Sequence, residues 1–163
     1  MTRPDPTSVE RVGIVGAGVI GGAWAAHFMR HGMTVKMWDP DPDAEEKFHA
    51  RANAIMHTLE ELGMAEGASL DNVIFVPTLE EAVADAQFIQ ENTPERLPIK
   101  ISTYQAIDAA APPDSVIASS TSGYLMSEMA VDLKHPERCV VAHPFNPVYL
   151  MPVVEVVAGP ETS

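Results

Sequence analysis

The sequence predicts an α/β fold: a doubly wound, mostly parallel sheet with helices on both of its faces. Short β-branched runs alternate with amphipathic stretches along most of the chain, which is typical of parallel strands joined by crossover helices. Glycines or polar residues follow almost every apolar run, at the strand ends where such sheets bind their ligands. These two observations predict a single ligand site along one edge of the sheet.

The predicted strands are short apolar runs bounded by glycine, proline or polar residues. The first follows a polar, proline-containing tail over residues 1–10 and ends in the glycines of RVGIVGAG. The others are TVKMWD, NVIFVPT, AQFIQENT, SVIASSTS and two strands within CVVAHPFNPVYLMPVVEVV that prolines separate. We assign residues 11–163 to one domain, which suits a chain of 163 residues.

The predicted helices lie between these strands and have apolar residues at helical spacing. VIGGAWAAHFMRHG ends at Gly32, and DAEEKFHARANAIMHTLEELG begins near Asp41 or Asp43 and ends at Gly63. LEEAVAD is a short helix, PERLPIKISTYQAIDAAA is helical after its prolines, and YLMSEMAVDL is a weak helix.

Composition excludes several classes of protein. At 46% hydrophobic and 20% charged residues, the chain can build a core, and no apolar run approaches the length of a membrane span. The formal net charge of −13 argues against nucleic acid and anionic membrane surfaces as partners. The N-terminal residues lack the apolar core of a signal peptide, so we expect a cytoplasmic protein. Cys139 is the single cysteine and is predicted to be a small buried residue, and no metal site is expected.

The stretch GAGVIG matches the pattern G-x-G-x-x-G at Gly16, Gly18 and Gly21. It follows a predicted strand and opens a helix, and Asp39 ends the next strand, which is the context of a Rossmann-type NAD site. Gly16 permits the tight turn, Gly18 the approach of the pyrophosphate and Gly21 the packing of helix on sheet, while Asp39 accepts ribose hydroxyls and repels a 2′-phosphate. The predicted cofactor-binding loop is Gly16, Ala17, Gly18, Val19, Ile20 and Gly21. The alternatives are a turn with a helix cap, or FAD, which usually needs a longer chain.

Four segments in order resemble the NAD-binding domain of the 3-hydroxyacyl-CoA dehydrogenases: VGIVGAGVIGGAWAAHF, ENTPERLPIK, ASSTSGYL and HPFNPVYLMPVVEVV. QENTPERL, SSTSG and HPERCVVAHPFNPVYLMPVVEVV are more similar to one branch of that family, the L-carnitine dehydrogenases. The resemblance covers residues 11–158. It implies a second, helical domain that closes the substrate cleft and forms a homodimer interface. Because the chain stops at AGPETS, we expect that domain to be absent here and the chain to be the N-terminal half of an enzyme.

Oxidation of a secondary alcohol needs a base that titrates near neutral pH and a group that orients and stabilises its protonated form. His143 and Glu155 lie on neighbouring predicted strands joined by a proline-bounded turn, so their side chains can meet. The matching residues of the resembled family form such a pair. We predict His143 as general base and Glu155 as its partner; the alternative is a structural histidine beside an exposed glutamate.

The resemblance also implies two substrate-facing residues. Ser122 matches a serine that hydrogen-bonds the substrate oxygen, and a hydroxyl can both donate and accept there. Its alternative role is the N-cap of the helix before YLMSEM. Asn146 matches an asparagine that either orients the substrate or holds its loop, and these roles stay open.

Four further residues are predicted to bind the cofactor. Glu95 and Lys100 match positions near the nicotinamide ribose, the alternative being an ordinary solvated helix start. Ser120 stands where acyl-CoA enzymes have an asparagine that contacts a cofactor ribose, and Asn92 follows the strand AQFIQE.

The function implied is NAD-dependent oxidation of the 3-hydroxyl of L-carnitine to 3-dehydrocarnitine. Aromatic faces suit its quaternary ammonium group, and Tyr124, Phe145 and Tyr149 are candidates. An L-3-hydroxyacyl-CoA dehydrogenase shares the chemistry, but CoA needs basic residues and the chain has ten Lys and Arg. A non-catalytic NAD-binding module would tolerate loss of His143 or Glu155, both of which are present.

Overall fold

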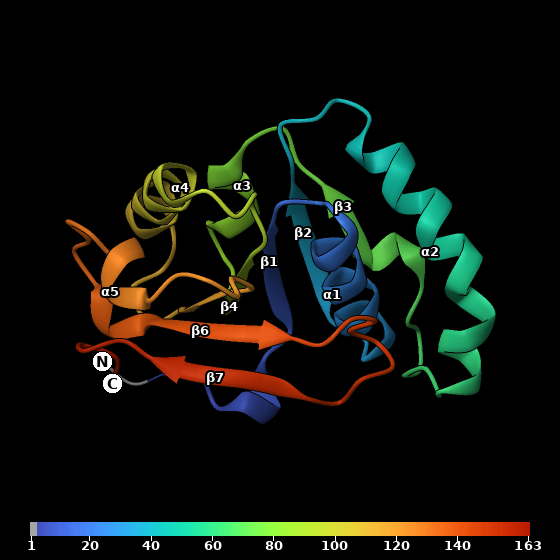
Figure 1. The fold of residues 1–163 in the computed structure, drawn as a ribbon. Coiled ribbons are helices and arrows are strands. Elements are labelled where there is room, and N and C mark those ends of the chain that lie inside the picture. The colour runs from blue at the N-terminus through green and yellow to red at the C-terminus, as the bar shows by residue number, and fades with distance from the viewer. Residues whose placement is uncertain (1–2) are drawn as a thin grey trace.

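The computed structural model describes residues 3–163 as one seven-stranded sheet with the strand order β3-β2-β1-β4-β5-β6-β7 (Figure 1). Strands β1 to β6 pair in parallel, and β7 runs antiparallel to β6 at the edge, so the predicted mostly parallel sheet is confirmed. The strands are β1 Arg11–Val15, β2 Thr34–Trp38, β3 Val73–Phe75, β4 Phe88–Glu91, β5 Val116–Ser119, β6 Cys139–Pro144 and β7 Val154–Ala158.

Helices cover both faces of the sheet, as Figure 1 shows and as the alternating pattern predicts. The helices are α1 Val19–Arg30, α2 Ala44–Glu61, α3 Leu79–Val83, α4 Leu97–Ala110 and α5 Met126–Met129, with short 3-10 turns at Pro6–Ser8, Leu70–Asn72 and Pro136–Arg138. A core built around Val12 and Ile14 lies under α1 and α2, and a second core built around Val15 and Ile89 lies under α3, α4 and α5. The side chains of β1 therefore alternate between two apolar layers.

The predicted helix ends are confirmed at two glycines. The chain leaves α1 at Gly32, where φ is +80°, and leaves α2 at Gly63, where φ is +88°. Both angles lie in the left-handed region that glycine adopts without strain, which is the usual way to end a helix. At the other end of α2, Asp43 occupies the cap position.

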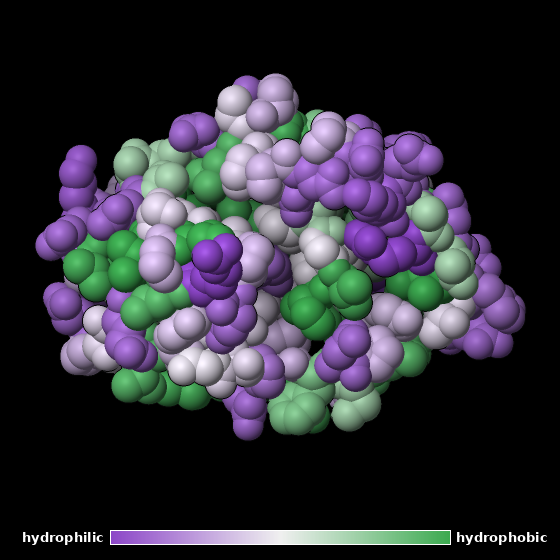
Figure 2. Space-filling model, turned by 45° about the horizontal axis from the view of Figure 1, so that its top comes forward, coloured by the Kyte–Doolittle hydropathy of each residue, from purple (hydrophilic) through white to green (hydrophobic). Residues whose placement is uncertain are grey.

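The strand order reverses between β1 and β4, and the crevice outside a reversal of this kind is where doubly wound sheets bind ligands. The loops after β1, β2, β4, β5 and β6 all reach this edge, since these strands are parallel. Figure 2 shows a hydrophilic surface along the side of the molecule where α2 lies and separate hydrophobic groups nearer the centre. No helix within residues 3–163 has the length and apolar character that a membrane span requires.

The described part of the predicted tail, residues 3–10, contains one 3-10 turn that Asp5 caps by accepting a hydrogen bond of 2.8 Å from the Thr7 amide. Gln87 then fixes the start of β1, because its Oε1 accepts from the amides of Glu10 and Arg11 at 2.9 and 3.1 Å. Residues 1 and 2 lie outside the described residues.

Candidate active site

The three motif glycines have different surroundings. Gly16 has φ +95°, and a Cβ there would lie 2.7 Å from the carbonyl oxygen of Asn92. A Cβ on Gly21 would lie 1.9 Å from the carbonyl oxygen of Gly16, so this glycine packs against the loop itself, although helix-on-sheet packing was predicted. A Cβ on Gly18 would meet no described protein atom within 4 Å. Gly16 therefore lets the loop pack against the end of β4 and Gly21 lets it pack on itself, whereas the loop is open to a ligand at Gly18.

The N-terminus of α1 presents free donors at this opening. Gly18 is the cap residue and supplies no side chain, and no acidic residue lies in the first turn. The amides of Val19 and Ile20 lie in that first turn, where an α-helix offers them no acceptor. Unpaired amides and the helix dipole together favour an anionic group such as a pyrophosphate.

Asp39 connects the glycine loop to the end of β2. Its Oδ2 accepts from the Ala17 amide at 2.6 Å, and its Oδ1 accepts from the Asp41 amide at 2.9 Å. The Ala17 amide is thus used inside the protein. Each carboxylate oxygen keeps a further lone pair for a ribose hydroxyl. The donors, the opening at Gly18 and this carboxylate fit the adenosine half of NAD.

Ser120 links the ends of β4 and β5. Its hydroxyl donates to Asn92 Oδ1 at 2.7 Å and accepts from Gln90 Nε2 at 2.8 Å and Trp24 Nε1 at 3.2 Å. A serine hydroxyl has one proton and two lone pairs, so these bonds saturate it. Ser120 and Asn92 therefore hold the ends of β4 and β5 together. Sequence reasoning missed Gln90 and Trp24, because ordinary strand and helix positions gave no signal.

Lys100 lies inside the protein, since its residue is 1% exposed. Its Nζ donates to the two carboxylate oxygens of the fully buried Glu91 at 3.0 and 3.1 Å and to the Thr93 carbonyl at 3.2 Å. Glu91 also accepts from the Ser119 hydroxyl at 2.5 Å. The solvated helix start is thus excluded for Lys100, and its donors face protein groups. Its contact with the cofactor stays a prediction. Glu91 was among the polar residues at strand ends that predicted the site, but no role was predicted for it.

Glu95 holds the loop that carries Ser122. Its Oε1 accepts from the Thr121 hydroxyl at 2.5 Å and from the amides of Gly123 and Ser122 at 2.9 and 3.2 Å, while Oε2 lies 3.5 Å from Lys100 Nζ. Burial acts to raise the pKa of Glu95, but the hydrogen bonds from this loop and the Lys100 charge outweigh it, so the pKa lies below its usual value. The ionised Glu95 carboxylate therefore holds the loop of residues 121–123 in place.

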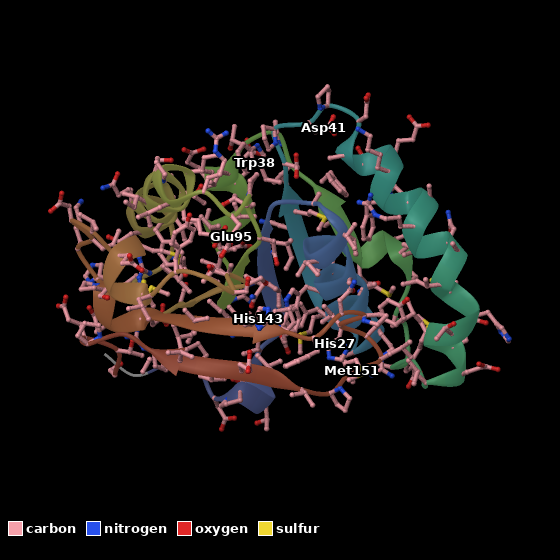
Figure 3. All side chains as sticks on the ribbon, in the orientation of Figure 1. His27, Trp38, Asp41, Glu95, His143 and Met151 are labelled. Carbon is pink, nitrogen blue, oxygen red and sulfur yellow. The ribbon has the colours of Figure 1, made fainter. Side chains whose placement is uncertain are left out.

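His143 and Glu155 occupy directly opposed positions on β6 and β7. His143 Nδ1 lies 2.9 Å from Glu155 Oε2, with the side chains 29% and 60% exposed. Because a carboxylate can only accept, Nδ1 carries the proton in this bond, and Nε2 is left as the basic nitrogen. Figure 3 shows His143 toward the middle of the molecule, below Glu95.

Ser122 shares a cavity of about 170 Å³ with His143, Glu155 and Tyr124. Helix α5 begins at Met126 with Leu125 as its cap, so Ser122 is not that helix's N-cap. Asn146 lies elsewhere: it lines a neighbouring cavity of about 330 Å³ together with Tyr149. The Phe145 ring lies beside the His143 ring, with centroids 5.9 Å apart.

Cys139 and His27, for which no role in the site was predicted, lie in apolar or aromatic surroundings. Cys139 is buried, and burial raises the pKa of its thiol to about 12, which leaves it unreactive. Within residues 3–163, no cluster of three or more His, Cys, Asp or Glu is arranged to hold a metal ion. His27 packs against Trp24 and His31, far along α1 from the glycine loop.

A glycine loop and an opposed histidine–carboxylate pair along the same edge of a doubly wound sheet are typical of NAD-dependent dehydrogenases. The chain belongs to one family among these, because residues 11–163 match the family described as 3-hydroxyacyl-CoA dehydrogenase, NAD binding domain. NAD is therefore the cofactor of this domain.

Relatives and solved structures agree with this membership. The chain is 57% identical to an L-carnitine dehydrogenase of Nocardiopsis dassonvillei over 96% of its length and 54% identical to one of Streptomyces coelicolor over 100%. It spans 48% and 51% of those relatives, about half their length. A crystal structure of 3-hydroxybutyryl-CoA dehydrogenase from Escherichia coli superposes with a TM-score of 0.84 at 27% identity, over 96% of this chain and 34% of that one. A 5-formyl-3-hydroxy-2-methylpyridine 4-carboxylic acid 5-dehydrogenase gives 0.86 at 30% identity, over 95% and 50%.

Proposed function

We propose that this chain is the cofactor-binding half of an enzyme that oxidises the 3-hydroxyl of L-carnitine to 3-dehydrocarnitine. The observation that carries the proposal is the His143–Glu155 pair, placed on the same edge of the sheet as the NAD loop. The substrate is inferred from relatives named L-carnitine dehydrogenase, which are 57% and 54% identical to this chain.

Nicotinamide supplies the hydride acceptor when NAD is bound. His143 takes the proton from the substrate hydroxyl at Nε2, while Nδ1 keeps its hydrogen bond to Glu155. The Glu155 carboxylate then lies beside the imidazolium and stabilises it. Ser122, in the same cavity, donates to the substrate oxygen as it changes from alcohol to ketone.

The side chains around this cavity suit the trimethylammonium end of L-carnitine. Glu155 brings a carboxylate and Tyr124 an aromatic ring, and the 40% exposed Phe145 adds a ring beside His143. Carboxylates and aromatic faces both attract a trimethylammonium group. An acyl-CoA substrate would instead require cations for its phosphates, and among the described residues neither a lysine nor an arginine lines this cavity.

The proposal includes a second domain. Strand β7 is exposed along its whole length, with Val154, Val156 and Val157 among its residues. An exposed apolar edge strand is normally covered. We propose that a helical domain covers it, completes the substrate cleft and forms a homodimer, and that the enzyme is cytoplasmic, where the Cys139 thiol stays reduced.

The test uses the full-length gene product, with L-carnitine and L-3-hydroxybutyryl-CoA offered separately with NAD and NADH formation followed. Turnover of L-carnitine only, lost in His143→Ala, is the expected result. Turnover of the CoA ester only would identify an acyl-CoA, and not L-carnitine, as the substrate. NAD binding without turnover of either compound would favour a non-catalytic module.

A further inference from the structure

Arg51 lies on α2 and reaches across to the glycine loop. Its Nη2 donates to the carbonyl oxygen of Ala17 at 2.7 Å. Ala17 immediately precedes Gly18, the motif glycine whose missing side chain leaves open space. The hydrogen bond therefore holds a guanidinium group beside the anion-binding end of α1.

Arg51 also lines the cavity of about 330 Å³ and is the one charged residue among its lining residues. Val19 and Gly22 of the first turns of α1 line the same cavity. His143 does not, because it lines the separate cavity of about 170 Å³. Arg51 thus lies beside the start of α1 and outside the cavity of the His143–Glu155 pair, although Asn146 lines the same cavity as Arg51.

The Arg51 guanidinium has no carboxylate within 4.0 Å among the described residues, as is also true of Arg11 and Arg30. Its charge is therefore not offset by an ion pair and remains available to an anionic ligand. Asp39 at the end of β2 adds negative charge beside the loop, since it has no cationic partner among the described residues, whereas Asp41 is paired with Lys47 at 2.6 Å. An anionic cofactor needs a local cation to offset this field.

We propose that Arg51 binds the pyrophosphate of NAD, adding a cation to the amide donors of α1. The guanidinium keeps one donor on Ala17 and has others free to meet phosphate oxygens. Because Arg51 follows Asp39 by twelve residues and lies outside the G-x-G-x-x-G pattern, the motif alone does not identify it. The inference rests on NAD binding and is independent of the proposed substrate.

The test compares Arg51→Gln with Arg30→Gln. Arg30 is a matched control because it too donates to main-chain carbonyls, those of Leu62 and Gly63 at 2.9 and 3.1 Å, but at the opposite end of α1. Binding of NAD, ADP-ribose and adenosine is measured by calorimetry. Arg51→Gln is expected to weaken NAD and ADP-ribose alike, by about tenfold or more, as for loss of a charged hydrogen bond. The affinity of Arg51→Gln for adenosine should stay unchanged, and Arg30→Gln should bind all three ligands as the original protein does.

Three results would overturn the proposal: unchanged NAD affinity in Arg51→Gln, an equal loss for adenosine, or an equal loss in Arg30→Gln. A change confined to the KM for substrate would instead assign Arg51 to a substrate carboxylate. Thermal unfolding without ligand shows whether Arg51→Gln folds. If Arg51→Gln does not fold, Arg51→Lys is measured instead, because lysine keeps the charge but not the planar donors. The proposal then requires that Arg51→Lys binds ADP-ribose more weakly and adenosine as tightly as the original protein.

Discussion

His143 and Glu155 face each other across the β6–β7 ladder, with Nδ1 2.9 Å from Oε2. Their neighbours in the register, Val141 opposite Val157 and Pro144 opposite Val154, fix this pairing through the main chain. A shift of one residue would send one of the two side chains to the other face of the sheet. The geometry of the pair is therefore built into the antiparallel edge of the sheet.

Replacement of Glu155 by Gln keeps the shape of the side chain and removes its charge. In the full-length enzyme, kcat for the proposed substrate should fall by about 10²-fold, within the range for loss of acid–base assistance. The physical reason is that the imidazolium loses its anionic partner. NAD affinity, measured by titration, should not change, because Glu155 lies away from the glycine loop.

The control for this prediction is Glu161→Gln, which removes another exposed carboxylate six residues further along the chain. Its kcat should equal that of the unchanged enzyme. Equal activity in Glu155→Gln and Glu161→Gln would show that Glu155 has no role in orienting or stabilising His143.

Gly18→Ala and Gly21→Ala should separate cofactor binding from folding. The new methyl group on Gly18 meets no described atom within 4 Å and Gly18 has φ −61°, so the free energy of unfolding should hardly change. The methyl group should nevertheless occupy the space of the phosphates and weaken NAD by about tenfold or more. On Gly21 it lies 1.9 Å from the Gly16 carbonyl, which should destabilise the fold by about 1–3 kcal/mol.

Chemical denaturation and NAD titration of both variants check this prediction. A Gly18→Ala protein that binds NAD as tightly as the original would place the pyrophosphate elsewhere. A Gly21→Ala protein of full stability would show that the loop relaxes around the added methyl group.

Local signals predicted the elements well, and the reason is physical. Gly32 and Gly63 end helices because they take positive φ, and that requirement is visible in the sequence. The His143–Glu155 meeting was also predictable, since a short connection between neighbouring strands brings such residues together.

The hydrogen-bond network was not predictable, because it depends on which side chains compete for each donor. The predicted cofactor contacts of Lys100 and Ser120 stay predictions, but the protein partners of these side chains had no signal in the sequence. Lys100 pairs with the buried Glu91. The Ser120 hydroxyl accepts from Gln90 and Trp24. These contacts join different strands and helices, and no sequence spacing encodes them.

The Glu91–Lys100 pair gives a stability prediction. Lys100→Met leaves the Glu91 carboxylate buried without its cation, which should lower the free energy of unfolding by about 3–5 kcal/mol. Glu91→Gln in the same chain removes that stranded charge, so the double variant should regain a large part of the loss. Urea denaturation of the two single variants and the double variant measures the coupling.

Lys36→Met is the control, because Lys36 pairs with Asp85 at 2.8 Å on the surface, where the side chains are 32% and 47% exposed. It should cost about 1 kcal/mol or less. If Lys100→Met costs no more than Lys36→Met, water enters the pair and the network does not hold the loop rigidly.

His27 should make the fold sensitive to acid. Its Nδ1 is buried without a hydrogen-bond partner among the described residues, and its ring lies 4.9 Å from the His31 ring, centroid to centroid. Burial, followed by the charges of His31 and Arg30, lowers the pKa of His27 from 6.5 to about 4. Between pH 6.5 and about 4, the unfolded chain therefore binds a proton at His27 that the folded chain does not bind.

Because the pKa of His27 is lower in the folded than in the unfolded chain, the free energy of unfolding is at its full value above pH 6.5. It declines as the pH falls from 6.5 toward 4. The decline from this group stays below ~1.4 kcal/mol per pH unit, because His27 is partly exposed and solvent screens its charge. His27→Phe keeps an apolar ring against Trp24 and cannot titrate, so its free energy of unfolding should fall less between pH 6.5 and 5. Urea denaturation of both proteins at these two pH values measures the difference, and parallel losses would mean that other groups carry the acid sensitivity.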